Sequence, residues 1–127
     1  TSSDPAEGVE LSLTVPNGVQ WKVNAITFTL VAGAAAANRV VHVVFNNGGG
    51  VTFNCFSSVA QIISETKKYS CIPIGQALDE ADDNDIIIPI PPDLWLDAGA
   101  IITTETTALN ALDNFGVMEV WRQQYFK

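Results

Sequence analysis

Alternating apolar and polar positions recur along this chain, and they predict strands rather than helices. The clearest case is residues 9–15, where every second residue is apolar and the residues between are polar. Successive side chains of a strand point to opposite faces, so one face of this segment should meet a core. The residues expected to face that core are Val9, Leu11, Leu13 and Val15.

The next predicted strand, residues 19–31, changes its apolar parity midway. Val19, Trp21, Val23 and Ala25 follow one phase, and Ile26, Phe28 and Leu30 follow the other. A β-bulge near Ala25 would bring both sets onto one face, because one extra residue shifts the alternation. The alternative is a strand that passes from one sheet to the other at this point.

Turn signals recur about every ten residues and divide the rest of the chain into short strands. Residues 59–64 are ambiguous, because Val59, Ile62 and Ile63 have helical spacing. We favour a strand here, returning as a hairpin into residues 69–74. The further predicted strands are residues 39–45, 51–56, 100–106 and 115–125. Eight to nine strands with almost no helix predict an all-β fold, an antiparallel β-sandwich of the jelly-roll type.

Three prolines restrict where the segment 86–104 can lie. Pro89, Pro91 and Pro92 interrupt an apolar run, and proline cannot donate to a sheet ladder. We therefore expect this run at the edge of a sheet or between two sheets.

The length of 127 residues predicts one domain with one core. Residues 1–8 are polar and read as a flexible, extended N-terminal arm, followed by a single β-sandwich domain over residues 9–127. The hydrophobic fraction of 47% exceeds what a thin two-sheet core needs. Some apolar surface should therefore contact other chains, which predicts an oligomer.

The charge of the chain excludes several partners. Its net charge is −8, with 14 acidic and 6 basic residues, whereas nucleic-acid binding rests on a concentrated positive face. No apolar stretch reaches the roughly 20 residues of a membrane span, and no basic-then-apolar leader opens the chain, so we expect a soluble protein.

Cys55 and Cys71 lack the spacing of zinc or redox motifs, and without an export signal free thiols are favoured over a disulfide.

Candidate catalytic chemistry is sparse. The single histidine, His42, lies in a valine-rich segment, which favours a core or interface role over a catalytic triad. The loop 75–85 is acidic, and Asp82, Asp83 and Asp85 are weak candidate cation ligands, although the calcium-loop pattern is not matched. A solvated loop is the favoured interpretation. We expect neither an enzyme nor a cofactor.

The three tryptophans have different expected roles. Trp21 and Trp121 should fill the core, because large aromatic side chains suit a thin sandwich. Trp95 sits among prolines, where it either closes the end of the sandwich or docks on a neighbour. The spacing gives no support for an exposed aromatic row that would bind sugars.

Three segments carry a family resemblance: Val15-Pro-Asn-Gly-Val-Gln-Trp21, Ala37-Asn-Arg-Val-Val-His-Val-Val-Phe45, and Ile90-Pro-Pro-Asp-Leu-Trp-Leu-Asp-Ala-Gly99. In this order and spacing, over most of residues 9–121, the chain resembles the jelly-roll cement or decoration proteins on the heads of tailed bacteriophages. The resemblance implies a homotrimer that binds the major capsid protein on the exterior of the virion and reinforces contacts between capsomers. It also implies assembly in the host cytoplasm and no catalytic residues.

Contacts in such proteins are distributed over the surface, so the interface residues are inferred from this chain. We expect them on the N-terminal arm, on the strand around His42 and at the tryptophan corner. They are Thr1, Pro5, Val41, His42, Leu94, Trp95 and Leu96. The main alternative is a phage tail or fibre component that recognises a host glycan or receptor. A bacterial carbohydrate-binding module is a weaker alternative.

Overall fold

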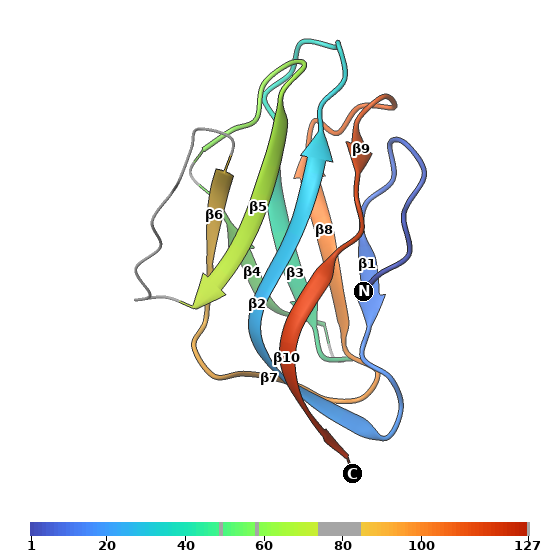
Figure 1. Cartoon of the computed structure of the whole chain (residues 1–127), viewed down its shortest axis with the longest axis vertical. Coiled ribbons are helices and arrows are strands. Elements are labelled where there is room, and N and C mark those ends of the chain that lie inside the picture. The colour runs from blue at the N-terminus through green and yellow to red at the C-terminus, as the bar shows by residue number, and fades with distance from the viewer. Residues whose placement is uncertain (49, 58, 74–84, 127) are drawn as a thin grey trace.

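The computed structural model describes residues 1–48, 50–57, 59–73 and 85–126, and over these residues the chain is all-β (Figure 1). The described part contains ten strands and no helix, so no helix there could cross a membrane. Sheet A has the order β1 (Ser12–Thr14), β8 (Ile101–Thr107), β3 (Val40–Asn46) and β4 (Val51–Phe56). Sheet B has the order β10 (Glu119–Phe126), β2 (Val19–Val31), β5 (Thr66–Pro73) and β6 (Asp85–Ile90). Two short strands that the sequence did not reveal, β7 (Leu94–Leu96) and β9 (Asn114–Phe115), also pair with β2.

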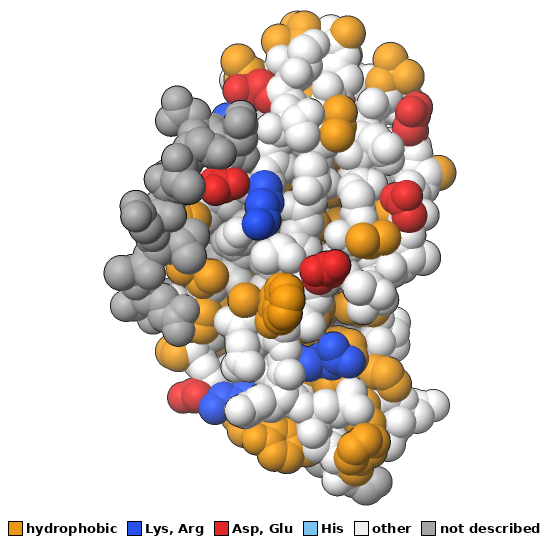
Figure 2. All heavy atoms as spheres, viewed as in Figure 1, with side chains coloured by type: hydrophobic (Ala, Val, Ile, Leu, Met, Phe, Trp, Pro, Cys, Tyr) orange, Lys and Arg blue, Asp and Glu red, His pale blue; other side chains and the backbone are white. Residues whose placement is uncertain are grey.

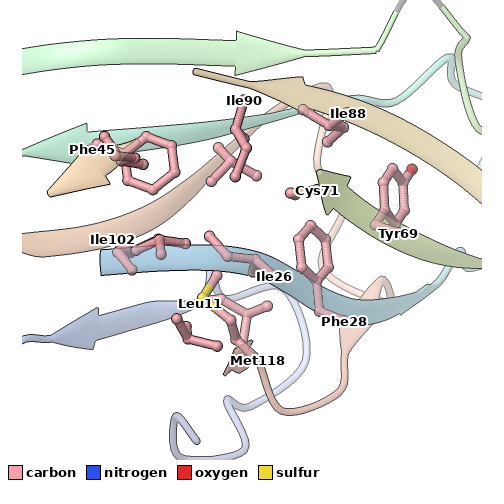
Figure 3. Packing of buried hydrophobic residues seen from close by; sticks show 14 of the residues in the cluster. Leu11, Ile26, Phe28, Phe45, Tyr69, Cys71, Ile88, Ile90, Ile102 and Met118 are labelled. Atoms are coloured by element: carbon pink, nitrogen blue, oxygen red, sulfur yellow. The ribbon is translucent and has the colours of Figure 1, made fainter. Parts of the chain in front are cut away.

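The two sheets bury a common hydrophobic core, an arrangement that is compatible with a β-sandwich. Phe45 and Ile102 of sheet A join Ile26 and Ile88 of sheet B in one buried cluster (Figure 3). Phe28 anchors the aromatic part of this core. Its ring stacks on Tyr69 with centroids 5.0 Å apart and meets the edge of Phe115 at 5.8 Å.

The pairing of β5 with β6 corrects the prediction of a purely antiparallel fold. These strands run parallel, with Tyr69 opposite Ile86 and Ile72 opposite Pro89, so sheet B is mixed. Parallel neighbours need a long crossover, and this one lies in residues 74–84, outside the described residues. The proline prediction is confirmed, because β6 is the end strand of sheet B.

The predicted bulge in residues 19–31 is also confirmed. Residues 19–27 of β2 pair with β10, but the register passes from Trp121–Ala25 to Arg122–Val23 and skips Asn24. Both apolar sets therefore face the same core, and Trp21 and Ile26 are both buried. The alternative, a strand that changes sheets, is wrong.

The predicted strand at 59–64 is wrong. Only Gln61 makes a β-bridge, to Arg39, and β5 pairs with β2 instead of forming the expected hairpin. The Gln61 side chain explains the irregular path. It is fully buried, donates to the carbonyls of Leu30 and Glu65, and accepts from the Tyr69 hydroxyl at 2.8 Å. Side-chain hydrogen bonds therefore hold this segment where a strand would use backbone pairing.

The first predicted strand is shorter than expected, and Val9 is 49% exposed rather than buried. At Glu10, hydrogen bonds between the side chain and β8 take the place of backbone pairing between the strands. Its carboxylate accepts hydrogen bonds from the Thr106 amide at 2.6 Å and from the hydroxyls of Thr104 and Thr106. Regular pairing with β8 begins only at Ser12.

Residues 1–8 lie against the domain in place of the flexible arm expected from the sequence. Ser2 is buried, its amide donates to the Met118 carbonyl at 2.9 Å, and its hydroxyl accepts from the Met118 amide at 2.8 Å. At the other end the Gly8 amide donates to the Asp113 carbonyl. Gly8 has φ +74°, and a Cβ there would lie 3.0 Å from the Ala111 Cα, so only glycine fits this approach.

Candidate functional surfaces

The residues expected at an interface fall into two groups. Val41, Leu94 and Leu96 are buried between the sheets and are core residues rather than surface contacts. Strand alternation is the reason, because Leu94 and Leu96 flank Trp95 on β7 and point to the opposite face. Trp95 is exposed, as is Thr1, whereas Pro5 and His42 are half-buried.

Trp95 belongs to an exposed aromatic group at one end of sheet B, where β2, β7 and β10 meet. Its ring lies 5.3 Å from that of Tyr125, and the next residue, Phe126, is 81% exposed. Lys22 Nζ lies 5.7 Å from the Trp95 centroid and 3.2 Å from the carboxylate of Asp93. We call Trp95, Tyr125 and Phe126 the terminal aromatic patch. Hydrophobic side chains gather at this end of the molecule, near the C-terminus (Figures 1 and 2).

A second exposed apolar group lies at the opposite end of β2. Its residues come from the end of β2, the 62–65 turn and the turn before β9. The turns are adjacent, since Ala32 bonds to Glu65 and a Cβ on Gly33 would approach Leu112. Its members are Val31, Ile62, Ile63 and Leu112, which we call the distal apolar patch.

Trp121 lies on the surface, which corrects the prediction that it fills the core. Val120 is buried and therefore takes the inner face, so the next side chain points outward and is 56% exposed. Trp121 lines a groove of about 460 Å³ together with residues of β2, β5 and the β9–β10 connection. The groove residues are Thr27, Phe28, Thr29, Lys68, Gly116, Val117, Glu119 and Trp121. The core prediction for Trp21 is confirmed, and its indole N–H donates to Gln124 at 3.0 Å.

His42 lies on the outer face of sheet A. Its ring stacks on Phe56 with centroids 4.7 Å apart, and Nδ1 lies 2.9 Å from Asn54 Oδ1. With Glu105 and the two threonines that follow it, His42 and Asn54 line a shallow pocket of about 280 Å³. The amide contact orients the imidazole but supplies neither a nucleophile nor a carboxylate partner.

A buried ion pair that sequence reasoning missed joins two loops. Arg39 Nε donates to Asp113 Oδ2 at 2.8 Å, and both side chains are fully buried. The other guanidinium nitrogens donate to the carbonyls of Ala35 and Ala37. The only sequence signal was a charged residue at the start of an apolar strand, and the partner 74 positions away carried none.

Both carboxylate oxygens of Asp113 accept hydrogen bonds within this cluster. Its Oδ1 accepts from the Gly33 amide at 2.7 Å, and its Oδ2 also accepts from the Asn110 amide at 2.8 Å. Burial of the carboxyl opposes ionisation, but the hydrogen bonds from Arg39, Gly33 and Asn110 outweigh it and hold the pKa of Asp113 below its ordinary value. The cluster fixes the alanine-rich loop against the turn before β9.

The candidate metal ligands are not brought together in the described structure. Asp82 and Asp83 lie outside the described residues, and Asp85 begins β6. Among the described residues, no group of three or more His, Cys, Asp or Glu side chains is placed to hold a metal ion. Cys55 and Cys71 are free cysteines, and burial raises the pKa of both thiols.

Comparison with known proteins adds no relative. No protein-family model, no curated protein and no solved structure matches the chain. Function must therefore be inferred from the surfaces: two apolar patches at opposite ends of β2, and a groove of mixed chemistry on sheet B.

Proposed function

We propose that this chain is a structural protein of a phage virion, an oligomer of jelly-roll type that binds the exterior of the capsid and reinforces contacts between capsomers. The proposal begins from the resemblance of the segments 15–21, 37–45 and 90–99 to capsid decoration proteins. The observation that carries it is the pair of exposed apolar patches at the two ends of β2. A homotrimer and the major capsid protein are the proposed partners.

The spacing of the patches suits a bridging role. Strand β2 has 13 residues and runs from the terminal aromatic patch to the distal apolar patch, which separates them by about 40 Å along the strand at 3.3 Å per residue. A domain with apolar contacts at both ends can touch two neighbours at once. Figure 1 shows β2 and β10 extending together toward the C-terminal end.

The size of one patch favours several contacts over one. With about 200 Å² per aromatic side chain, the exposed fractions of Trp95, Tyr125 and Phe126 (42, 44 and 81%) leave roughly 300 Å² to cover. Covering that area contributes on the order of 8 kcal/mol, whereas association costs about 4–15 kcal/mol. A single contact is therefore marginal, and an oligomer that engages several sites gains by avidity.

The test is a titration of the purified chain onto DNA-free, expanded heads of the cognate phage. We expect saturation at a copy number set by the head's symmetry and a raised melting temperature of the heads. Light scattering should show a trimer. The double variant Tyr125→Ser, Phe126→Ser should lose attachment or the trimer, whereas Thr14→Ser, an exposed position on sheet A, should behave like the wild type. Failure of the wild-type chain to bind heads would refute the proposal.

The alternative role is recognition of a host glycan by a tail or fibre component. The groove beside Trp121 supports this alternative.

A further inference from the structure

A groove crosses the outer face of sheet B where β10, β2 and β5 are neighbours. Thr27 and Thr29 of β2 form its floor, and Lys68 of β5 and Glu119 of β10 stand on either side. The register places Thr27 opposite Glu119 and Thr29 opposite Lys68, so all four side chains share one face. Figure 2 views this face, where acidic, basic and hydrophobic side chains lie close together. The volume of about 460 Å³ is within the range of small-molecule sites.

Short side chains around Trp121 keep the groove open. The residue paired with Trp121 is Ala25, and Gly116 lines the groove without a side chain. The Gly116 amide donates to the Thr29 carbonyl at 2.9 Å, which fixes the β9–β10 connection beside the floor. The groove is therefore built by backbone pairing and does not need to rearrange for a ligand to enter.

The groups that line the groove are available to a ligand. Within the described part of the chain, Trp121 has neither a stacking partner nor a hydrogen bond to its indole nitrogen. Lys68 and Glu119 likewise form no ion pair there. The site thus offers one flat apolar ring, one cationic donor, one anionic acceptor and two hydroxyls.

This combination matches a sugar better than other ligands. The C–H face of a pyranose ring can pack on the indole, while its hydroxyls accept from Lys68 and donate to Glu119. A purely apolar ligand would cover Lys68 and Glu119 without giving them partners, which is costly. A polyanion would meet Glu119 and the net charge of −8.

We propose that this groove binds a neutral oligosaccharide, with one sugar ring stacked on Trp121. Thr27, Thr29, Lys68 and Glu119 would hold its hydroxyls. The site is separate from the terminal aromatic patch, so this inference goes beyond the proposed attachment to capsids and does not depend on it.

The test begins with an array of neutral oligosaccharides (glucans, galactans, mannans and xylans) and of acidic ones (sialylated and uronate-containing). The purified chain should bind members of the neutral class. Calorimetry with the best neutral oligosaccharide should then show binding about tenfold weaker for Trp121→Ala. The control Trp95→Ala also removes an exposed tryptophan, but from the terminal aromatic patch, and should bind within about twofold of the wild type.

Two further measurements keep the result interpretable. Trp121→Ala should fold like the wild type, with a circular dichroism spectrum that is unchanged, because the side chain is 56% exposed. In the wild-type chain, the same oligosaccharide should shift the amide resonances of Thr27, Thr29 and Gly116. Binding of acidic glycans only, no binding to the array, or equal losses in both tryptophan variants would overturn the proposal.

Discussion

The buried pair Arg39–Asp113 offers the sharpest test of how this fold is held together. The perturbation is Asp113→Asn, which removes the negative charge with almost no change in volume. An asparagine has one oxygen, whereas both carboxylate oxygens of Asp113 accept hydrogen bonds, three in all, from Arg39, Gly33 and Asn110. At least one donor therefore loses its acceptor, and the guanidinium loses its counter-charge.

The expected magnitude follows from the burial of both side chains, which are fully excluded from solvent. Breaking a buried ion pair by removing one partner costs about 3–5 kcal/mol, because the remaining charge is left uncompensated. A domain of this kind has a total stability of about 5–15 kcal/mol. The melting temperature should therefore fall by roughly 10–20 °C.

The assay is urea unfolding followed by tryptophan fluorescence, with thermal unfolding by circular dichroism alongside. The matched control is Asp93→Asn. Asp93 pairs with Lys22 at 3.2 Å, but its side chain is mostly exposed, so the loss should lie within about 1 kcal/mol. Asparagine also tolerates the positive φ of 53° at this position.

The reasoning would be refuted if the two variants lost the same stability. A loss below about 1 kcal/mol for Asp113→Asn would mean that the cluster is solvated or that the two loops are not held together by it.

Three further predictions concern the pH dependence of this ion pair, the two cysteines and the N-terminal segment. The pKa of Asp113 is depressed in the folded state, so its stabilisation is complete above its ordinary pKa of about 3.9 and is lost as pH falls toward the folded value. The stability gap between the wild type and Asp113→Asn should therefore be constant near neutral pH and shrink in acid; a gap that widens in acid would contradict this. With a thiol reagent at pH 8, native Cys55 should react before Cys71, because Cys71 is fully buried with a raised pKa; faster modification of Cys71 by mass spectrometry would count against the core packing. Deletion of residues 1–8 removes both hydrogen bonds between Ser2 and Met118 and should cost about 1–3 kcal/mol, seen as faster amide exchange in residues 114–118; unchanged exchange would show that the segment does not dock.

The strands that could be read from the sequence are those whose side chains alternate locally. The parity change at Ala25 predicted either a bulge or a change of sheets, and the pairing of β2 with β10 decided for the bulge. The prolines restricted their run to an edge or to a position between two sheets for a local reason, the missing N–H donor, and the structure places β6 at the edge. The strand prediction for residues 59–64 was wrong because the Gln61 side chain is held by the carbonyl of Leu30, 31 positions away, a contact that no local pattern records.

The candidate sites depended more on the tertiary structure. The exposure of Trp121 could not be seen in advance, since Val120 and Trp121 are both apolar and only the pairing of β10 decides which one faces inward. The same holds for Val41, Leu94 and Leu96, whose apolar character fitted an interface as well as a core.

The sequence by itself determined the all-β fold class, because side-chain alternation is set within a few residues. It also reduced residues 19–31 to a bulge or a change of sheets, and the proline run to an edge or a position between two sheets. Only the tertiary structure decided the parallel pairing of β5 with β6, the ion pair between Arg39 and Asp113, and the groove beside Trp121. The ion pair and the groove join segments far apart in the chain, and the direction of β6 depends on how it packs against the core. The free energy that selects these features depends on burial, which exists only once the two sheets have packed.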